Sequence, residues 1–154
     1  MISKTDVNSA LKIWADGIVY LGSLKDAINV LKQEAVVFID SVYAYEDMKE
    51  VLFKPTKASV AQFRLNKEAA LSYFIGENSD YPEDKGFALH PWKNISFENV
   101  GYILEENRAL VMGNYYFTDF DNMVVKAEYT FGFKKVNGQL KIDLHHSSFP
   151  YKIN

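Results

Sequence analysis

The chain has 154 residues, of which 48% are hydrophobic and 24% are charged, as is typical of one globular domain. Its 17 basic and 20 acidic residues give a net charge of −3 with no basic stripe for nucleic acid, and its apolar runs are shorter than the roughly 20 residues of a membrane span. It contains no cysteine, which excludes disulfides, thiolate nucleophiles and cysteine-ligated metals. We expect a single domain over residues 1–154 that is cytoplasmic, unless a signal peptide has been removed.

The first part of the sequence is typical of helices. Apolar residues recur every three or four positions from Val7 to Leu21, behind the candidate N-caps Ser3 and Thr5, and again from Leu24 to Val42. These patterns predict two amphipathic helices.

A short strand and a third helix are predicted next. The apolar segment Val51–Phe53 stops before Pro55, because proline removes a hydrogen-bond donor from a strand. Residues 67–75 are good helix formers between the N-cap Asn66 and Gly76. The polar segment that follows predicts a loop.

From Trp92 onward, alternating apolar and aromatic residues predict long antiparallel strands joined by hairpins. Asn137-Gly138 is the strongest turn signal, because a type I′ turn needs positive φ at both central residues. Helices followed by such strands predict an α+β fold, with N-terminal helices packed on a strongly curved, mostly antiparallel sheet. A cone of this kind has a natural cavity.

The last predicted strand carries the polar residues of greatest chemical interest. Residues 141–148 read Lys-Ile-Asp-Leu-His-His-Ser-Ser, and the two charged residues mark the wetter face. Strict alternation then turns His146 and Ser148 towards the core, and His145 and Ser147 outward. A bulge in the strand would reverse this assignment.

An imidazole and a hydroxyl inside an apolar cone need hydrogen-bond partners. They are either core residues that bond each other, a tyrosine or a trapped water, or a general base with a positioning hydroxyl. Zinc is disfavoured, because His145 and His146 project to opposite faces and His90 is the third imidazole of the chain. The sequence has no Gly-Xaa-Ser-Xaa-Gly elbow and no phosphate-binding glycine motif.

A series of sequence blocks spans residues 51 to 151. The blocks are Val51-Leu52-Phe53-Lys54-Pro55-Thr56-Lys57-Ala58, Glu68–Phe74, Tyr81–Phe87, Met112–Thr118, Glu128–Gly132 and Leu144–Tyr151. In this order they resemble the iota class of carbonic anhydrases. The ordered set is more specific than the His-His-Ser-Ser ending, which is also similar to the association domain of calcium/calmodulin-dependent protein kinase.

The resemblance implies a fold like that of nuclear transport factor 2 (an NTF2-like cone) and reversible hydration of CO2 to bicarbonate. The family's polar pocket residues fall by motif on Thr56, Tyr73, His146 and Ser148, where strand parity selects the last two. The three hydroxyls would hold water and bicarbonate, and His146 would accept the proton. Some members of the family need no metal and others use manganese, so the resemblance alone does not assign the cofactor; we expect none, with manganese as the alternative and zinc disfavoured.

A second class of function is a non-catalytic NTF2-like domain for small-molecule binding or oligomerisation. Such a domain would assemble through the outer face of its sheet, with Tyr115 or Tyr129 in the contact if these face outward. A homodimer or higher homo-oligomer is expected under either function, because a broad aromatic-rich sheet face favours isologous contacts.

Overall fold

The computed structural model describes residues 1–48 and 50–153. Its elements, in chain order, are α1 (Lys4–Ser23), α2 (Ile28–Val42), β1 (Leu52–Lys54), α3 (Lys67–Ile75), the 3-10 helix η1 (Phe87–Leu89), β2 (Trp92–Leu104), β3 (Arg108–Asp119), β4 (Val124–Val136) and β5 (Gln139–Ser148). Each predicted helix and strand is present, with ends shifted by a few residues. Within these described ranges, no helix is long and apolar enough to cross a membrane.

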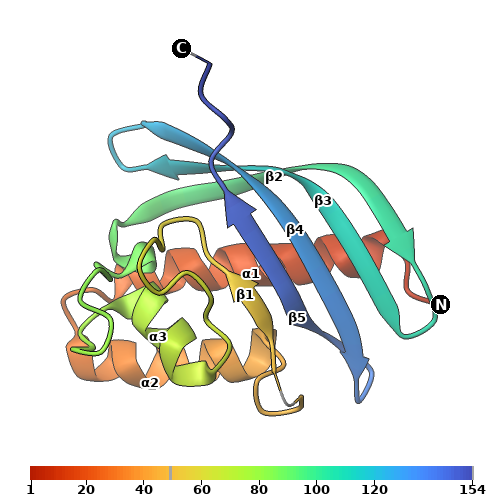
Figure 1. Cartoon of the computed structure of the whole chain (residues 1–154), viewed down its shortest axis with the longest axis horizontal. Coiled ribbons are helices and arrows are strands. Elements are labelled where there is room, and N and C mark those ends of the chain that lie inside the picture. Colours follow the sequence, from red (N-terminus) through yellow and green to blue (C-terminus); the bar gives the residue numbers. More distant parts are fainter. Residues whose placement is uncertain (49, 154) are drawn as a thin grey trace.

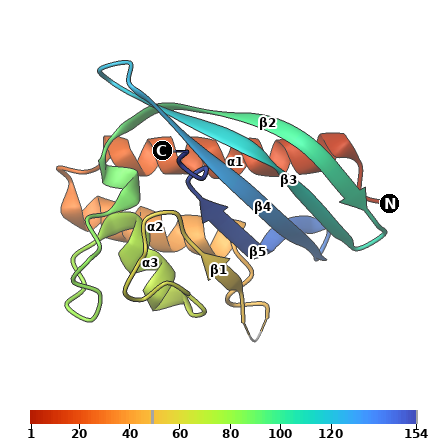
Figure 2. The same ribbon diagram turned by 45° about the horizontal axis from the view of Figure 1, so that its top comes forward.

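The strands form one sheet in the order β1-β5-β4-β3-β2. β1 pairs with β5 in parallel, and the other neighbours are antiparallel. Figures 1 and 2 show β2, β3 and β4 arching over α1, while α2 and α3 lie beside β1. The predicted α+β class with helices on a curved, mostly antiparallel sheet is confirmed.

Local sequence signals set the ends of these elements. The Ser3 Oγ accepts the N–H of Asp6 at 3.1 Å, and the Asp6 carboxylate accepts the N–H of Ser3 at 2.8 Å, which forms a capping box at α1. The Asn66 side chain accepts an N–H from the first turn of α3. At the β4–β5 turn, Asn137 and Gly138 have φ of 50° and 81°, as a type I′ turn requires.

An aromatic core fills the space between α1 and the concave face of the sheet. The Trp14 ring lies 5.7 Å from the Tyr115 ring and 5.6 Å from the Phe131 ring, measured between centroids. Tyr115 and Tyr129 are both buried in this core. Neither tyrosine therefore faces outward, so the condition under which they would take part in an assembly contact is not met.

Strand β5 contains a bulge that the sequence pattern did not reveal. Gly132 of β4 is paired with Leu144, but the next residue, Phe133, is paired with Ile142. Asp143 is therefore an extra residue in β5, and it exchanges the two faces of the strand beyond it.

The bulge decides which histidine and which serine face the core. His145 and Ser147 are only 2% and 1% exposed, whereas His146 is exposed and Ser148 lies beside it on the outer face. The prediction that His146 and Ser148 point inward is therefore wrong. It assumed unbroken alternation along β5, and one additional residue reverses that alternation.

Two residues of neighbouring strands accommodate this bulge, one by a hydrogen bond and the other by its lack of a side chain. Arg108 of β3 donates a hydrogen bond to the Asp143 carboxylate at 2.5 Å. Across the pair, a Cβ on Gly132 would lie 2.8 Å from the Leu144 Cβ and 3.0 Å from the Arg108 Nη2. These distances are shorter than ordinary van der Waals contact, so only glycine leaves room for the bulge at this position.

We predict that Gly132→Ala destabilises the protein by about 1–3 kcal/mol, the usual cost of overpacking. Urea unfolding of the variant and the wild type measures the difference. Gly101→Ala is the matched control, because a Cβ on that strand glycine meets nothing within 4 Å. An equal loss of stability in the two variants would show that the contacts at the bulge are unimportant.

Candidate active site

A small cavity lies on the concave side of the sheet. Its wall contains Trp14, Phe53, Pro55, Thr56, Tyr73, Phe74, Phe87, Tyr115, Phe117, His145 and Ser147. The space open to the centre of a water molecule is about 10 Å³, close to what one ordered water needs. Two of the four predicted site residues, Thr56 and Tyr73, line this cavity, and the other two, His146 and Ser148, do not.

The hydroxyl groups of the cavity are clustered. The Thr56 Oγ1 lies 2.5 Å from the Ser147 Oγ, which also accepts a hydrogen bond from the Tyr115 hydroxyl. The Tyr73 hydroxyl accepts the backbone N–H of Lys57 at 3.2 Å and has the Thr56 hydroxyl as a neighbour, so it keeps its own hydrogen to donate within the cluster. Burial raises the pKa of both tyrosines above its ordinary value, so both stay protonated donors.

His145 is held between two tyrosine hydroxyls and two aromatic rings. Its Nδ1 lies 2.9 Å from the Tyr43 Oη, and its Nε2 lies 3.2 Å from the Tyr115 Oη. The ring stacks between Phe53 and Phe131, with centroid distances of 4.8 and 4.0 Å. Burial lowers the pKa of His145 well below its ordinary value, so the imidazole is neutral at pH 7.

Thr56 lies on the loop after β1, and Glu83 anchors that loop. The Glu83 carboxylate accepts the backbone N–H groups of Ser59, Val60 and Ala61 at 2.7 to 3.2 Å. These hydrogen bonds, with a smaller effect of the nearby Arg64, lower the pKa of Glu83 to about 2.

The buried Arg64 side chain links the end of this loop to α3 and to the segment that follows α3. The Arg64 guanidinium is fully buried and donates to both carboxylate oxygens of Asp84, at 2.7 and 2.8 Å. It also donates to the carbonyl oxygens of Ala61 and Ala69. The loop that carries Thr56 and the helix that carries Tyr73 are therefore joined through one guanidinium.

The Glu83 anchor makes the fold sensitive to acid. Because the pKa of Glu83 is about 2 in the folded state and 4.5 without partners, its stabilisation is complete above pH 4.5 and is lost as pH falls towards 2. We predict that Glu83→Gln lowers the melting temperature at pH 7, and that its difference from the wild type shrinks below pH 4.5.

Thermal unfolding followed by circular dichroism between pH 3 and 7 measures this difference. Glu105→Gln at an exposed position is the control and should follow the wild type. A difference between Glu83→Gln and the wild type that is constant over this range would contradict the assigned anchor.

The cavity adjoins a larger hollow at the surface, of about 510 Å³, which we call the mouth. Tyr73 and Phe87 line both spaces, and their rings stack 5.6 Å apart. They therefore form the wall between the cavity and the mouth. Lys57 also lines the mouth, where its ammonium lies 5.9 Å from the centroid of the Phe87 ring.

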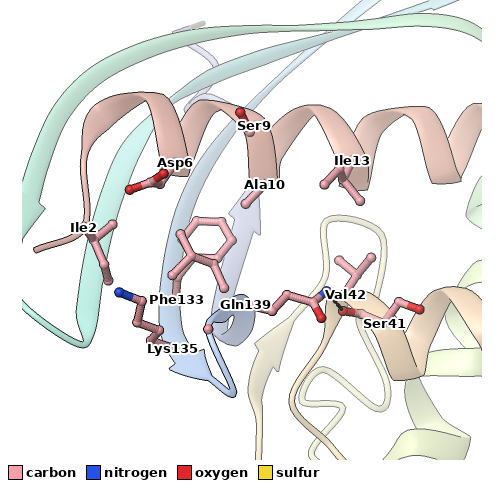
Figure 3. A pocket seen from close by; sticks show the side chains of 12 residues that line it. Ile2, Asp6, Ser9, Ala10, Ile13, Ser41, Val42, Phe133, Lys135 and Gln139 are labelled. Carbon is pink, nitrogen blue, oxygen red and sulfur yellow. Dashed lines mark hydrogen bonds between the residues drawn. The ribbon is translucent and has the colours of Figure 1, made fainter.

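A separate hollow of about 310 Å³ lies between α1, the end of α2 and the β4–β5 hairpin. Figure 3 shows Ala10 of α1 facing Phe133 across it. Two of its polar side chains serve the fold, because Asp6 caps α1 and the Gln139 amide donates to the Ser41 carbonyl at 3.0 Å, and it has no cluster of hydrogen-bonded hydroxyls like that of the cavity. We therefore place the functional site at the hydroxyl-lined cavity.

Among residues 1–48 and 50–153, no three His, Asp or Glu side chains lie close enough together to hold a metal ion. The predicted obstacle to a three-histidine zinc site is also visible, since His145 is buried and its neighbour His146 is exposed on the opposite face. The cavity offers hydroxyl groups and one imidazole instead.

Sequence reasoning missed three groups that complete the site. Trp14, Tyr43 and Tyr115 each contribute a polar atom to the cluster around His145. These three residues occupy the same positions in the hydrophobic pattern as ordinary core residues, so periodicity alone does not distinguish a site residue from a core residue. The signal that could have found them is the need of an inward imidazole for two polar partners.

An α+β cone with a cavity lined by hydroxyl groups defines the class of protein. The described residues share this fold with a solved protein from Xanthomonas campestris described as a calcium/calmodulin-dependent protein kinase II association domain. That match has 18% identity and a TM-score of 0.67, and covers 99% of this chain and 91% of the other. An NTF2-like protein from Shewanella oneidensis matches at 15% identity and a TM-score of 0.55, over 96% and 99% of the two chains. The predicted NTF2-like fold is confirmed.

The sequence itself identifies the family. Residues 5–149 match the family model for metal-independent carbonic anhydrase. A metal-independent carbonic anhydrase from Nostoc sp. (strain PCC 7120) is 37% identical over 155 residues, which cover 98% of this chain and 75% of the relative. A cyanobacterial iota-carbonic anhydrase, solved with bicarbonate, matches with a TM-score of 0.94 at 36% identity over 99% and 94% of the two chains. The chain belongs to the metal-independent carbonic anhydrase family and is a lyase, as the resemblance predicted.

Proposed function

We propose that this carbonic anhydrase activity, the reversible hydration of CO2 to bicarbonate, takes place in the cavity at Thr56, Tyr73 and Ser147. The observation that supports the proposal is the cluster of hydroxyl groups in an otherwise aromatic pocket. The cyanobacterial relative was solved with bicarbonate, which supports bicarbonate and CO2 as the ligands here.

In the proposed reaction a water molecule held by the hydroxyls attacks the carbon of CO2. The aromatic wall offers apolar contact to the uncharged CO2, and the hydroxyls orient the water next to it, which supplies proximity. Because the cavity holds about one water, CO2 enters when a wall side chain moves. The half-buried Phe87, between the cavity and the mouth, is in the position to do so.

Negative charge develops on the two CO2 oxygens as the new C–O bond forms. Donor hydrogens from the Thr56–Ser147 pair and from Tyr73 stabilise this charge where water is largely excluded, so each donor acts strongly. The attacking water loses one proton, which leaves bicarbonate, and the proton passes to solvent. His146 is not its acceptor, because it is exposed on the outer face of the sheet.

The adjacent serines supply a sharp test of this site. We predict that Ser147→Ala lowers kcat/KM for CO2 hydration by about 100-fold, the usual effect of removing one donor to a developing oxyanion. Ser148→Ala removes the same group one residue away on the outer face and should retain the wild-type rate. Stopped-flow CO2 hydration on protein dialysed against a chelator, with a manganese add-back, makes the measurement.

Thr56→Val should resemble Ser147→Ala, because it removes the hydroxyl and keeps the shape of the side chain. Loss of activity in Ser148→Ala but not in Ser147→Ala would contradict the assignment. The absence of activity in the wild type with and without manganese would instead favour the non-catalytic binding or assembly domain.

We further propose that the chain forms a homodimer through the outer face of the sheet. This face has a hollow of about 460 Å³ lined by Val100, Met112, Glu128 and His146, among others. Val100 and Met112 are 72% and 56% exposed, and apolar side chains grouped on a broad sheet face support a symmetric contact.

We predict that Met112→Glu converts the dimer to a monomer, because it places two like charges in a two-fold contact. Sedimentation equilibrium measures the mass. Ile13→Glu on α1 is the control, since Ile13 is 58% exposed and lies away from this face. A wild type that is monomeric, or a dimer that survives Met112→Glu, would exclude this interface.

A further inference from the structure

We propose that Trp14 is a positioning residue that fixes the direction of a hydrogen-bond chain through His145, so that this histidine donates from Nε2 towards the cavity and does not act as the base. The chain runs from Trp14 through Tyr43, His145, Tyr115 and Ser147 to Thr56. Its direction follows from the geometry alone, and its effect on catalysis rests on the function proposed above.

The chain begins at an atom that can only donate. The Trp14 Nε1 lies 2.9 Å from the Tyr43 Oη, and an indole nitrogen has no lone pair to accept with. Tyr43 therefore accepts this hydrogen bond. Both side chains are buried, so water does not compete for these groups.

The next step fixes the tautomer of His145. The Tyr43 Oη has two hydrogen-bond neighbours, the Trp14 Nε1 and the His145 Nδ1. If Nδ1 carried a hydrogen, the phenol would accept from both neighbours and its own buried hydrogen would face no acceptor, which is unfavourable. The phenol therefore donates to Nδ1. The neutral imidazole then carries its hydrogen on Nε2, which donates to the Tyr115 hydroxyl at 3.2 Å.

The last step brings the effect to the cavity. Ser147 and Thr56 have two hydroxyl hydrogens between them, and the 2.5 Å contact between their oxygens uses one. When Tyr115 donates its own hydrogen to Ser147, the second remains free for a substrate oxygen. In the opposite direction Tyr115 would take that hydrogen, and none would remain. Trp14 thus decides whether the pair offers a donor to the developing charge.

The groups around the imidazole favour the neutral form that this chain requires. The rings in contact with it belong to the uncharged residues Trp14, Tyr43, Phe53, Tyr115 and Phe131. Burial lowers the pKa of His145 well below its ordinary value. An imidazole with a donor on one side and an acceptor on the other orients hydroxyls without taking up a proton.

The experiment measures the tautomer directly. In the double variant His90→Gln/His146→Gln, His145 is the only histidine of the chain, and the 15N shifts of a labelled ring distinguish protonated from unprotonated nitrogen. We expect hydrogen on Nε2 and none on Nδ1 from pH 6 to 9. Trp14→Phe in this background keeps an aromatic ring and removes the N–H. It should populate the Nδ1–H form and lower kcat about fivefold with little change in KM, as the loss of one neutral hydrogen bond predicts.

Trp92→Phe is the matched control, because Trp92 is a second buried indole whose N–H donates to the Phe87 carbonyl, outside the chain. It should leave the tautomer unchanged. Tyr43→Phe tests the same step if Trp14→Phe does not fold. Hydrogen on Nδ1 in the parent, or a pure Nε2–H form in both Trp14→Phe and Tyr43→Phe, would overturn the proposal. The expected tautomers in a protein without CO2 hydration would contradict the proposed function and leave the direction of the chain standing.

Discussion

The bulge at Asp143 is the constraint on which the cavity depends. Side chains of a strand alternate between its faces, so one extra residue exchanges inside and outside for everything beyond it. Without this residue, His146 and Ser148 would enter the cavity in place of His145 and Ser147. Gly132 opposite the bulge leaves room for it, and Arg108 of β3 donates a hydrogen bond to the Asp143 carboxylate. A packing detail between two strands therefore selects the polar groups of the site.

The aromatic side chains around the cavity and the hydrogen-bonded polar groups among them depend on each other. Buried hydroxyls and an imidazole are tolerated in an apolar core because each finds a partner within it. In return, the rings exclude water, keep the tyrosines protonated and the histidine neutral, and make each hydrogen bond stronger than it would be in water. Thr56 differs from the other groups of the site, because it lies on a loop and not on a helix or strand. Its position depends on the Glu83 carboxylate and on the ion pair of Arg64 with Asp84.

The fold was largely predictable from the sequence, because helix periodicity, the caps Ser3 and Asn66 and the Asn137-Gly138 turn all act locally. The family was predictable from ordered sequence blocks. The faces of β5 were not, since a bulge leaves no mark in an alternating pattern and depends on contacts with β3 and β4. Motif transfer placed Thr56 and Tyr73 at the cavity, whereas parity selected the member of each His-His and Ser-Ser pair that faces outward. Trp14 and Tyr43 were hidden among core residues, because their role depends on three-dimensional contacts with His145.

The charges around the cavity are consistent with a reaction that runs in both directions. A cation inside the cavity would stabilise the transition state, but it would also hold the bicarbonate anion and slow its release. A neutral hydroxyl donates a weak hydrogen bond to an oxygen of uncharged CO2 and a stronger one to an oxygen on which charge develops. These donors therefore stabilise the transition state more than they stabilise bound CO2. Three cations lie outside the cavity wall: the Lys54 ammonium bonds the Ser147 carbonyl oxygen, the Arg64 guanidinium lies beside the Tyr73 ring, and Lys57 lies at the mouth beyond the Phe87 ring. The mouth carries both signs of charge, since Lys57 and Lys85 line it together with Glu83 and Asp84, whereas the side chains that line the cavity itself are uncharged.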